Sequence, residues 1–448
     1  METPSFTYQQ TLDYLFEKLP MFSRIGSAAI KKDLTNTLKL CEALGQPQEK
    51  FKSIHIAGTN GKGSTSHMLS AVLQKAGYKT GLYTSPHLVD FRERIRINGK
   101  EIPEQFVIDF VAKNKAVIEE IEPSFFEITV AMAFEAFAAE EVDIAIIETG
   151  LGGRLDSTNV ITPVLSIITN ISYDHMDMLG DTLTAIAKEK AGIIKPGVPV
   201  IIGESLDETE KVFFETSVRA GSTVYYADTL WDMVKTRKEE GLQHYKTVHK
   251  GSLKIIDLWT DMLGSYQQHN IKTVLTATEL LGALGWKLLL EDAFDALAQV
   301  KKLSGLRGRW DVMQQEPLVV ADVAHNPAGL TEVLKQWEQV PAAQKHVVLG
   351  FVKDKDVKTA LAQFSKDNIY YCTNASIPRA LPAEDLLEMA VEAGLNSTLF
   401  PSVADAVHTA IANSRPEDAV LITGSFFIVG EAMEALAGKK EGAAGATP

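Results

Sequence analysis

Residues 55–69, HIAGTNGKGSTSHML, have the residue types and spacing that a phosphate-binding loop needs. An apolar strand-like run leads into glycines, a lysine and two hydroxyl residues, and a helical pattern follows. Glycines let successive backbone N–H groups converge on an oxyanion at the positive end of a helix. Lys62 would then meet the β and γ phosphates, and Ser64 or Thr65 would offer a hydroxyl to Mg²⁺. A plain glycine turn, the alternative, would leave the lysine and the hydroxyls unexplained.

The loop is a variant, because Gly63 stands where the usual form places Ser or Thr directly after the lysine. The helix after it is predicted to bury one face and to stop at Gly77. That face carries Met68, Leu69, Val72 and Leu73.

Three polar residues follow other strand-like runs: Ser85 in LYTSPHL, Glu148 in DIAIIETG and His175 in TNISYDHMDMLG. Doubly wound sheets bind ligands at the carboxyl ends of their strands, so these side chains are expected to converge there. Together they would satisfy a divalent cation at a triphosphate. A solvated glutamate and a structural histidine are the alternatives. Residues 150–153 nearly spell a dinucleotide fingerprint, but Leu155 replaces its last small residue, which argues against nicotinamide binding.

The composition is that of a soluble globular protein of two or three domains. The 448 residues carry a formal charge of −14, which argues against nucleic-acid binding and favours small-molecule chemistry. Cys41 and Cys372 are too few and too far apart for a disulfide framework or a thiolate metal site, and we expect both to be buried. No basic leader and no apolar stretch of membrane-spanning length is recognisable, so we expect a cytoplasmic protein without membrane contact.

Short runs rich in Val and Ile alternate with helical patterns, which predicts an α/β fold with parallel sheets. The runs are SIHIAG, DIAIIETG, VLSIITN and VPVIIG in the first part of the chain, and LVVADV, HVVLGF, NIYYCT and AVLITG in the second. Residues 205–260 break this rhythm, and we expect them to form a small antiparallel β excursion at the edge of the first sheet.

A domain boundary is expected near residue 302, at the basic, glycine-broken stretch KKLSGLRGRW that follows the helical pattern NIKTVLTATELLGALG. Residues 1–302 would form a P-loop ATPase-like domain with a doubly wound, mainly parallel sheet. Residues 303–440 would form a smaller Rossmann-like α/β domain, and residues 441–448 a frayed tail.

Seven motifs in order resemble those of the folylpolyglutamate synthase and dihydrofolate synthase family, ATP-dependent ligases of the Mur ligase superfamily. The motifs are AGTNGKGS, TSPHL, ETGLGGRLDSTN, DHMDMLG, EKAGIIKPG, GRW and DVAHNP. The resemblance spans nearly the whole chain, from the loop near residue 58 to TGSFFIVGE near residue 431.

The resemblance implies which residues hold ATP and Mg²⁺. The ATP phosphates would be held by Asn60, Gly61, Lys62, Gly63 and Ser64, and two Mg²⁺ sites would be served by Ser85, Glu148, His175 and Lys190. Asn270 would lie near the adenine, although Tyr266 stands where the family commonly has a histidine. Lys190 matches a lysine that the family carbamylates, and a carbamate turns a cation into an anionic metal ligand. Without the resemblance, Lys190 would be interpreted as an ordinary exposed helix lysine.

The resemblance also implies that the second domain closes on the nucleotide. Arg309 would contact phosphate and Asp322 the ribose side, and a guanidinium suits phosphate because its donors form a rigid fork. His325 and Ser425 are further candidates for completing the closed site, and closure would exclude water. The residues expected to act in catalysis are Lys62, His175, Lys190 and His325.

A pterin pocket is implied between SFFE and GRLDS. It would be lined by Ser124, Phe126, Arg154, Asp156 and Ser157. Phe126 would stack on the flat ring, with a plain core phenylalanine as the alternative, and Asp156 would accept hydrogen bonds from the amino group of the pterin. Residues 21–34, MFSRIGSAAIKKDL, do not match the family's pterin-contacting segment, which leaves the choice between dihydropteroate and reduced folate open.

Arg92, Arg94 and Arg96 alternate with apolar residues before Asn98-Gly99, a strong hairpin signal. The alternation predicts three guanidiniums on one strand face. Such a stripe would hold the carboxylates of a glutamate or polyglutamate tail, and a solvated basic strand face is the equal alternative.

The activity implied by the resemblance is the joining of L-glutamate to a folate or pteroate carboxylate at the expense of ATP, through an acyl phosphate. The enzyme would be a folylpolyglutamate synthase, a dihydrofolate synthase or both, and a monomer. The alternatives are another Mur-type amino-acid ligase, or a nucleotide-dependent ATPase or binding module that ligates nothing.

Overall fold

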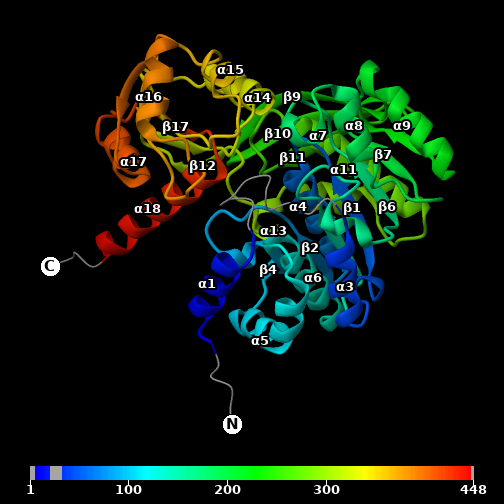
Figure 1. Cartoon of the computed structure of the whole chain (residues 1–448). Coiled ribbons are helices and arrows are strands. Elements are labelled where there is room, and N and C mark those ends of the chain that lie inside the picture. Colours follow the sequence, from blue (N-terminus) through cyan, green and yellow to red (C-terminus); the bar gives the residue numbers. More distant parts are fainter. Residues whose placement is uncertain (1–5, 21–32, 445–448) are drawn as a thin grey trace. The chain divides into compact units, whose positions relative to one another are not determined.

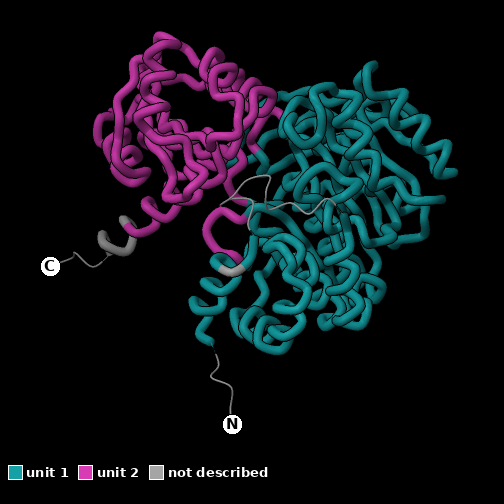
Figure 2. Tube along the Cα trace, in the orientation of Figure 1, with its two compact units in different colours: residues 1–86, 92–262, 267–306 teal, residues 87–91, 263–266, 307–448 magenta. Residues whose placement is uncertain are grey.

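The computed structural model describes residues 6–20 and 33–444 (Figure 1). Residues 21–32 of the segment without a family match, and residues 445–448 of the expected tail, lie outside the described residues. The chain divides into two compact units (Figure 2). Unit 1 comprises residues 1–86, 92–262 and 267–306, and unit 2 comprises residues 87–91, 263–266 and 307–448. The boundary near residue 302 and the functional division that it implies stay predictions.

Unit 1 is built on an eight-stranded sheet with the order β4-β3-β2-β5-β1-β6-β7-β8. Its strands are β1 (Lys52–Ala57), β2 (Thr80–Tyr83), β3 (Ile95–Ile97), β4 (Lys100–Glu101), β5 (Ile144–Glu148), β6 (Leu165–Ile168), β7 (Val200–Ile202) and β8 (Val224–Tyr226). The six strands from β2 to β8 in this order pair in parallel, and only β3 and β4 are antiparallel. The predicted α/β fold with a mainly parallel sheet is confirmed.

The described helices of unit 1 precede, connect or follow these strands. They are α1 (Tyr8–Lys18), α3 (Thr35–Ala43), α4 (Lys62–Lys75), α5 (Glu104–Ile121), α6 (Phe125–Ala139), α7 (Met176–Leu179), α8 (Leu183–Ala191), α9 (Asp207–Ala220), α10 (Ala227–Leu230), α11 (Gln267–Ala283), α12 (Leu290–Leu297) and α13 (Val300–Ser304). The described residues also form the 3₁₀ turns η2 (Pro47–Glu49), η3 (Phe91–Arg94) and η4 (Ser157–Val160).

The helix after the glycine loop, α4, is buried on every side, whereas the sequence predicted one buried face. All residues from Gly63 to Leu73 are buried. The cause is that α4 packs on β1, β2 and β5 on one side and on α11, α12 and α13 on the other. The predicted stop at Gly77 is confirmed, because Gly77 follows the helix with a φ of 90°.

The interpretation of residues 205–260 as one antiparallel excursion at the sheet edge was wrong for the first half. Residues in α9 are helical, and β8 joins the main sheet in parallel to β7. The antiparallel part is β9 (Trp231–Glu239), β10 (Leu242–His249) and β11 (Ile255–Thr260), which form a sheet of their own. Trp231, Tyr245 and Leu258 on this small sheet belong to the core that surrounds α4.

The expectation of three arginines on one strand face was also wrong. Arg92 and Arg94 lie in the 3₁₀ turn η3, and only Arg96 belongs to β3. The guanidinium of Arg94 is buried and lies 5.2 Å from the ring centre of Phe125, while Arg96 pairs with Glu101 at 3.0 Å. A tail-binding stripe on one strand is therefore absent. The predicted Asn98-Gly99 hairpin is confirmed, with φ values of 47° and 72°.

Unit 2 contains a six-stranded sheet with the order β12-β13-β17-β14-β15-β16, parallel except for β12. Its strands are β12 (Asp311–Gln314), β13 (Leu318–Ala321), β14 (Lys345–Leu349), β15 (Ile369–Cys372), β16 (Asn396–Leu399) and β17 (Ala419–Thr423). Its helices are α14 (Pro327–Glu338), α15 (Val357–Leu361), α16 (Ala383–Glu392), α17 (Val403–Ala412) and α18 (Phe426–Ala444). Apolar clusters cover both faces of the sheet, as expected for buried parallel strands.

Both cysteines are buried, as predicted, and burial raises the pKa of the Cys41 thiol to about 12 and that of Cys372 to about 11. Across the described ranges, no helix combines the length and the apolar character needed to cross a bilayer.

Two glycines give a matched test of the packing of the β3–β4 hairpin. A Cβ on Gly99 would lie 1.9 Å from the backbone oxygen of Leu303, whereas a Cβ on Gly197, with nearly the same φ of +71°, would meet nothing within 4 Å. We predict that Gly197→Ala lowers the free energy of unfolding by about 1 kcal/mol, because alanine is strained in the left-handed backbone conformation of this position. Gly99→Ala should cost about 1–3 kcal/mol more, because a backbone oxygen cannot move aside. Urea titrations of both variants would measure this, and equal losses would contradict the packing.

Candidate functional site

The carboxyl ends of four neighbouring parallel strands of unit 1 carry most of the predicted site residues. Gly58 follows β1, Ser85 follows β2, Glu148 ends β5, and Asn170 follows β6. Because β5 and β6 flank β1 on its two sides, these loops share one edge of the sheet. The backbone N–H of Ser85 donates to Oε2 of Glu148 at 3.2 Å, so the structure brings these two predicted metal ligands together.

The glycine loop is held in shape by the loop after β6. The N–H of Asn60 donates to Oδ1 of Asn170 at 2.8 Å, and the hydroxyl of Thr169 donates to the oxygen of Asn60 at 2.6 Å. A Cβ on Gly58 would lie 1.8 Å from that hydroxyl oxygen, so only glycine allows this close approach. Gly61, with a φ of 82°, then starts α4 without any side-chain cap. The loop thus presents a helix N-terminus in the arrangement that binds anions.

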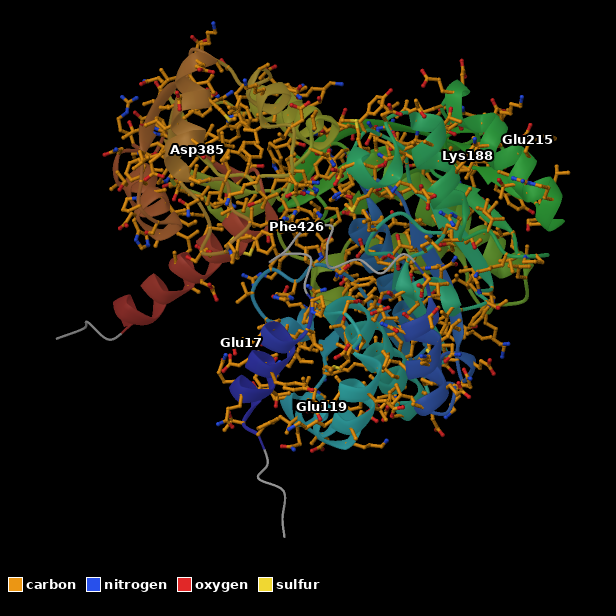
Figure 3. The ribbon with its side chains drawn as sticks, in the orientation of Figure 1. Glu17, Glu119, Lys188, Glu215, Asp385 and Phe426 are labelled. Carbon is orange, nitrogen blue, oxygen red and sulfur yellow. The ribbon has the colours of Figure 1, made fainter. Side chains whose placement is uncertain are left out.

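Two lysine side chains donate to one carbonyl oxygen of this loop. Nζ of Lys62 lies 3.0 Å from the oxygen of Gly58, and Nζ of Lys190, from α8, lies 2.8 Å from the same atom. Lys190 is 3% exposed, whereas Lys188 on the same helix points into solvent (Figure 3). Burial, and next the charge of Lys62, lower the pKa of Lys190 to about 7, against the opposing charges of Asp174 and Asp156. The interpretation of Lys190 as an exposed helix lysine is therefore wrong.

Asn270 lies directly beside the loop. A Cβ on Gly61 would meet its Oδ1 at 2.3 Å, and its Nδ2 donates to Gln267 at 2.8 Å. Gln267 in turn donates to the hydroxyl of Ser64 at 3.2 Å. The first turn of α11 and the first turn of α4 are therefore joined by a buried polar network.

Among the predicted metal ligands, Ser85 and Glu148 offer oxygen donors, which suit a hard divalent cation, and His175 offers an imidazole. Glu148 is 4% exposed, and a buried carboxylate requires a partner. His175 starts α7 with a φ of 50° and has its Nε2 3.8 Å from Asp174. Within residues 6–20 and 33–444, no group of three or more His, Cys, Asp or Glu side chains forms a ready metal cluster. The candidate set depends instead on a serine and a lysine.

Of the predicted pterin-pocket residues, Arg154, Asp156 and Ser157 lie in or directly after the glycine-rich loop that follows β5, and Ser124 and Phe126 lie at the start of α6. Phe126 is half-buried and packs on Gly150, where a Cβ would be 2.5 Å from the ring. Arg154 is exposed and pairs with Glu189 of α8 at 2.9 Å. Ser124 caps α6 by accepting from the N–H of Glu127.

Asp156 and Ser157 end this glycine-rich loop. Asp156 is 5% exposed and accepts from the N–H of Leu151 at 2.8 Å, and Ser157 begins η4. Burial raises the pKa of Asp156, while the hydrogen bonds that its carboxylate accepts, such as the one from Leu151, oppose the rise.

In unit 2, Asp322 is the most buried of the predicted nucleotide contacts, at 2% exposure. It accepts from the hydroxyl of Tyr266 and from the N–H of Trp310 at 2.7 Å. Burial raises its pKa, against these hydrogen bonds and the charge of Arg309. The guanidinium of Arg309 lies 4.9 Å from the ring centre of Phe426, which Figure 3 labels at the start of α18.

The two remaining candidates of unit 2 have partners nearby. The ring of His325 lies 5.6 Å from the ring of Phe426, and the hydroxyl of Ser425 accepts from the N–H of Ile428 at 3.2 Å. Unit 2 thus gathers Arg309, Asp322, His325 and Ser425 around the ends of β13 and β17.

Three residues that support the glycine loop are not among those predicted from the sequence. These are Thr169, Asn170 and Gln267. Thr169 and Asn170 follow β6 as Glu148 ends β5, so the strand-end argument would have found them. Gln267 carried no comparable signal, because its contacts come from the packing of α11 on α4.

Family models match both parts of the chain. The Mur ligase middle domain matches residues 56–278, and the glutamate ligase domain of Mur ligases matches residues 308–426. The α/β fold and these two matches therefore define a ligase of the Mur type.

A folylpolyglutamate synthase from Lacticaseibacillus casei is 32% identical over 443 residues, which cover 97% of this chain and 99% of that protein. The structure of E. coli FolC in complex with DHPP and ADP is 30% identical, with a TM-score of 0.85, and covers 98% of this chain and 100% of that chain. The structure of a bifunctional folylpolyglutamate synthase/dihydrofolate synthase with Mn, AMPPNP and L-glutamate bound is 28% identical, with a TM-score of 0.80. It covers 97% of this chain and 98% of that chain. The chain belongs to the folylpolyglutamate synthase and dihydrofolate synthase family. The predicted ATP-dependent amide-forming ligase is thereby confirmed.

The lowered pKa of Lys190 predicts a pH dependence of stability. Between pH 7 and 10.5 the unfolded chain holds a proton on this amine that the folded chain lacks, so its contribution to stability should rise with pH across this window and stay constant below it. The stability of the wild type relative to Lys190→Met should therefore increase from pH 7 to pH 10.5. Urea titrations of metal-free protein in CO₂-free buffer would measure it, with Lys188→Met as the exposed control. Parallel curves for wild type and Lys190→Met over that window would contradict the assignment.

Proposed function

We propose that this enzyme joins L-glutamate to the carboxylate of a pteroate or folate, here called the acceptor, and that it acts on both dihydropteroate and reduced folate. The observation that carries the proposal is that the amines of two lysines, the half-buried Lys62 and the buried Lys190, both donate to the oxygen of Gly58, just before α4. Lys62 and a helix N-terminus at one edge of a parallel sheet suit a polyphosphate, Lys190 with its lowered pKa suits a metal-binding carbamate, and family membership specifies the reaction.

The reaction proceeds in two steps. An oxygen of the acceptor carboxylate attacks the γ phosphorus of ATP, ADP leaves, and an acyl phosphate results. The neutral amino group of L-glutamate then attacks the acyl carbon, phosphate leaves with the bonding electron pair, and the amine loses its extra proton to water. A carboxylate is a poor electrophile, so the first step makes the second possible. Lys62 stabilises the negative charge on the transferred phosphoryl group.

Ser85, Glu148, His175 and Lys190 would hold two divalent cations, with Lys190 as its carbamate. Such ions neutralise phosphate charge when they are bound. The neutral form of Lys190 is accessible near pH 7, and a neutral amine is the form that reacts with CO₂. Asn60, Gly61, Gly63 and Ser64 would complete the phosphate site, and Asn270 would face the adenine.

Arg309 and Asp322 would contact the nucleotide from unit 2, and His325 and Ser425 would complete that side. Ser124, Phe126, Arg154, Asp156 and Ser157 would receive the acceptor. Phe126 is the best placed of these for stacking, because its half-buried ring already lies over Gly150. A cytoplasmic location and a monomeric state are part of the proposal.

The test is glutamate addition by purified protein with ATP, Mg²⁺ and L-glutamate, with dihydropteroate or tetrahydrofolate as acceptor and product mass as readout. We expect glutamyl adducts on both, and phosphate release that requires glutamate and acceptor together. An adduct on one acceptor alone would contradict the proposed dual activity. Phosphate release without any adduct would overturn the ligase.

The variant Lys62→Ala should lose glutamate addition by at least about 100-fold, because the charge on the transferred phosphoryl group loses its lysine. Its melting temperature should stay near that of the wild type, because Lys62 is only partly buried. Lys75→Ala is the matched control: it lies at the other end of α4, pairs with Asp295 at 3.4 Å and should keep full activity. Undiminished turnover by Lys62→Ala would contradict its assigned role.

A further inference from the structure

A fully buried histidine lies in the central strand of unit 1, three residues before the phosphate loop. His55 of β1 is 0% exposed and pairs with Ile147 of β5 and Ser166 of β6 on either side. Its neighbours Ile54 and Ile56 face the core around α4, so the alternation of a strand points His55 to the opposite face of the sheet. On that face its Nε2 lies 2.8 Å from the hydroxyl oxygen of Thr158 in η4.

The direction of each hydrogen bond in this chain of groups follows from proton counting. The hydroxyl of Thr158 lies 2.5 Å from Oδ1 of Asp156, and a carboxylate only accepts, so the single hydroxyl proton is used there. The contact with His55 therefore requires the histidine to donate from Nε2, which fixes its tautomer. Its Nδ1 is buried and finds no hydrogen-bond partner among the described residues. Burial, and next the charge of Lys195, lower the pKa of His55 to about 3, so the ring stays neutral.

The carboxylate at the end of this relay shapes the loop that carries the candidate acceptor contacts. Asp156 also accepts from the N–H of Thr158 at 3.0 Å and from the N–H of Leu151 at 2.8 Å. These hydrogen bonds fold residues 150–158 around the carboxylate of Asp156. This segment is here called the acceptor loop. Gly150 at one end of this loop packs on Phe126, and Arg154 in its middle pairs with α8.

We propose that His55 is a positioning residue for the acceptor loop, acting through Thr158 on Asp156. The inference rests on the proposed function, in which this loop receives the acceptor. A buried imidazole with an unused nitrogen is a costly way to fill a strand position. Its donated hydrogen bond gives the reason: it orients the Thr158 hydroxyl, which in turn fixes one oxygen of Asp156. Although His55 is close in sequence to the phosphate loop, it affects the binding of the acceptor and leaves the binding of ATP unchanged.

Kinetics of four variants test this separation. His55→Leu and Thr158→Val remove the hydrogen bonds of the relay and replace each polar side chain by an apolar one of similar size. Each should raise the KM for the acceptor by about tenfold or more, because displacement of a positioned group by a fraction of an ångström has effects of this order. The KM for ATP should stay within about twofold. His55→Gln and Thr158→Ser keep a donor and a hydroxyl and should restore the acceptor KM to within about threefold of the wild type. Equal rises in both KM values, or no rescue by the conservative variants, would overturn the proposal.

A matched control separates positioning from general loss of packing. His346 of β14 in unit 2 is also buried, contacts a hydroxyl, that of Tyr371, at 3.0 Å, and has an Nε2 without a partner in the described parts of the chain. His346→Leu should lower the melting temperature without changing the acceptor KM. An equal rise in the acceptor KM for His346→Leu would contradict a specific role of His55.

Amide hydrogen exchange tests the relay without any turnover, so its result is independent of the proposed function. Peptides that span residues 150–158 should exchange faster in Thr158→Val and His55→Leu than in the wild type and in His346→Leu. If the wild type adds no glutamate, the proposed function fails, while faster exchange still supports the relay. Unchanged exchange overturns the relay whatever the activity. Should His55→Leu fail to fold, ¹⁵N shifts of labelled histidine in the wild type decide, since any tautomer other than Nε2–H at His55 contradicts the assignment.

Discussion

The carbonyl oxygen of Gly58 accepts hydrogen bonds from two lysines, and the rest of the site depends on this constraint. Lys62 and Lys190 approach it to 3.0 and 2.8 Å, which places two amines close together in a largely buried place. Burial and mutual repulsion make two full charges there costly, as the lowered pKa of Lys190 shows. A polyphosphate would pair with Lys62, and conversion of Lys190 to its carbamate would remove the second positive charge. Gly58 itself must lack a side chain, because Thr169 fills the space that a Cβ would need.

The central strand β1 links the loop proposed to bind ATP to the loop proposed to bind the acceptor. Its carboxyl end begins the glycine loop that we propose to hold the phosphates, and its residues alternate between the core around α4 and the face that carries η4. β5, its neighbour, ends in Glu148 and leads into the acceptor loop. Because parallel hydrogen bonding fixes the two strands to each other, both loops begin from rigid backbone. A reaction that must bring a carboxylate oxygen to a γ phosphorus requires such positioning.

Much of this could be predicted from the sequence, because strand ends and glycine loops follow local rules. The loop at residues 58–64 and the strand-end positions of Ser85 and Glu148 needed only the pattern of apolar runs and the geometry of parallel sheets. What failed depends on tertiary packing. Arginines at alternate positions suggested a strand, yet the backbone forms the 3₁₀ turn η3 there. Nothing local marks Lys190 as buried, and the all-round burial of α4 arises from helices more than 200 residues later in the chain.

In the proposed reaction, the acceptor is activated as an acyl phosphate before glutamate attacks. The most direct test of this activation uses an acceptor labelled with ¹⁸O in the carboxylate that reacts, in a single turnover with ATP, Mg²⁺ and L-glutamate. Mass analysis of the released phosphate gives the answer. If an acyl phosphate forms, one ¹⁸O atom moves from the carboxylate to phosphate for every amide bond formed. Amide formation with phosphate that carries no ¹⁸O would contradict it.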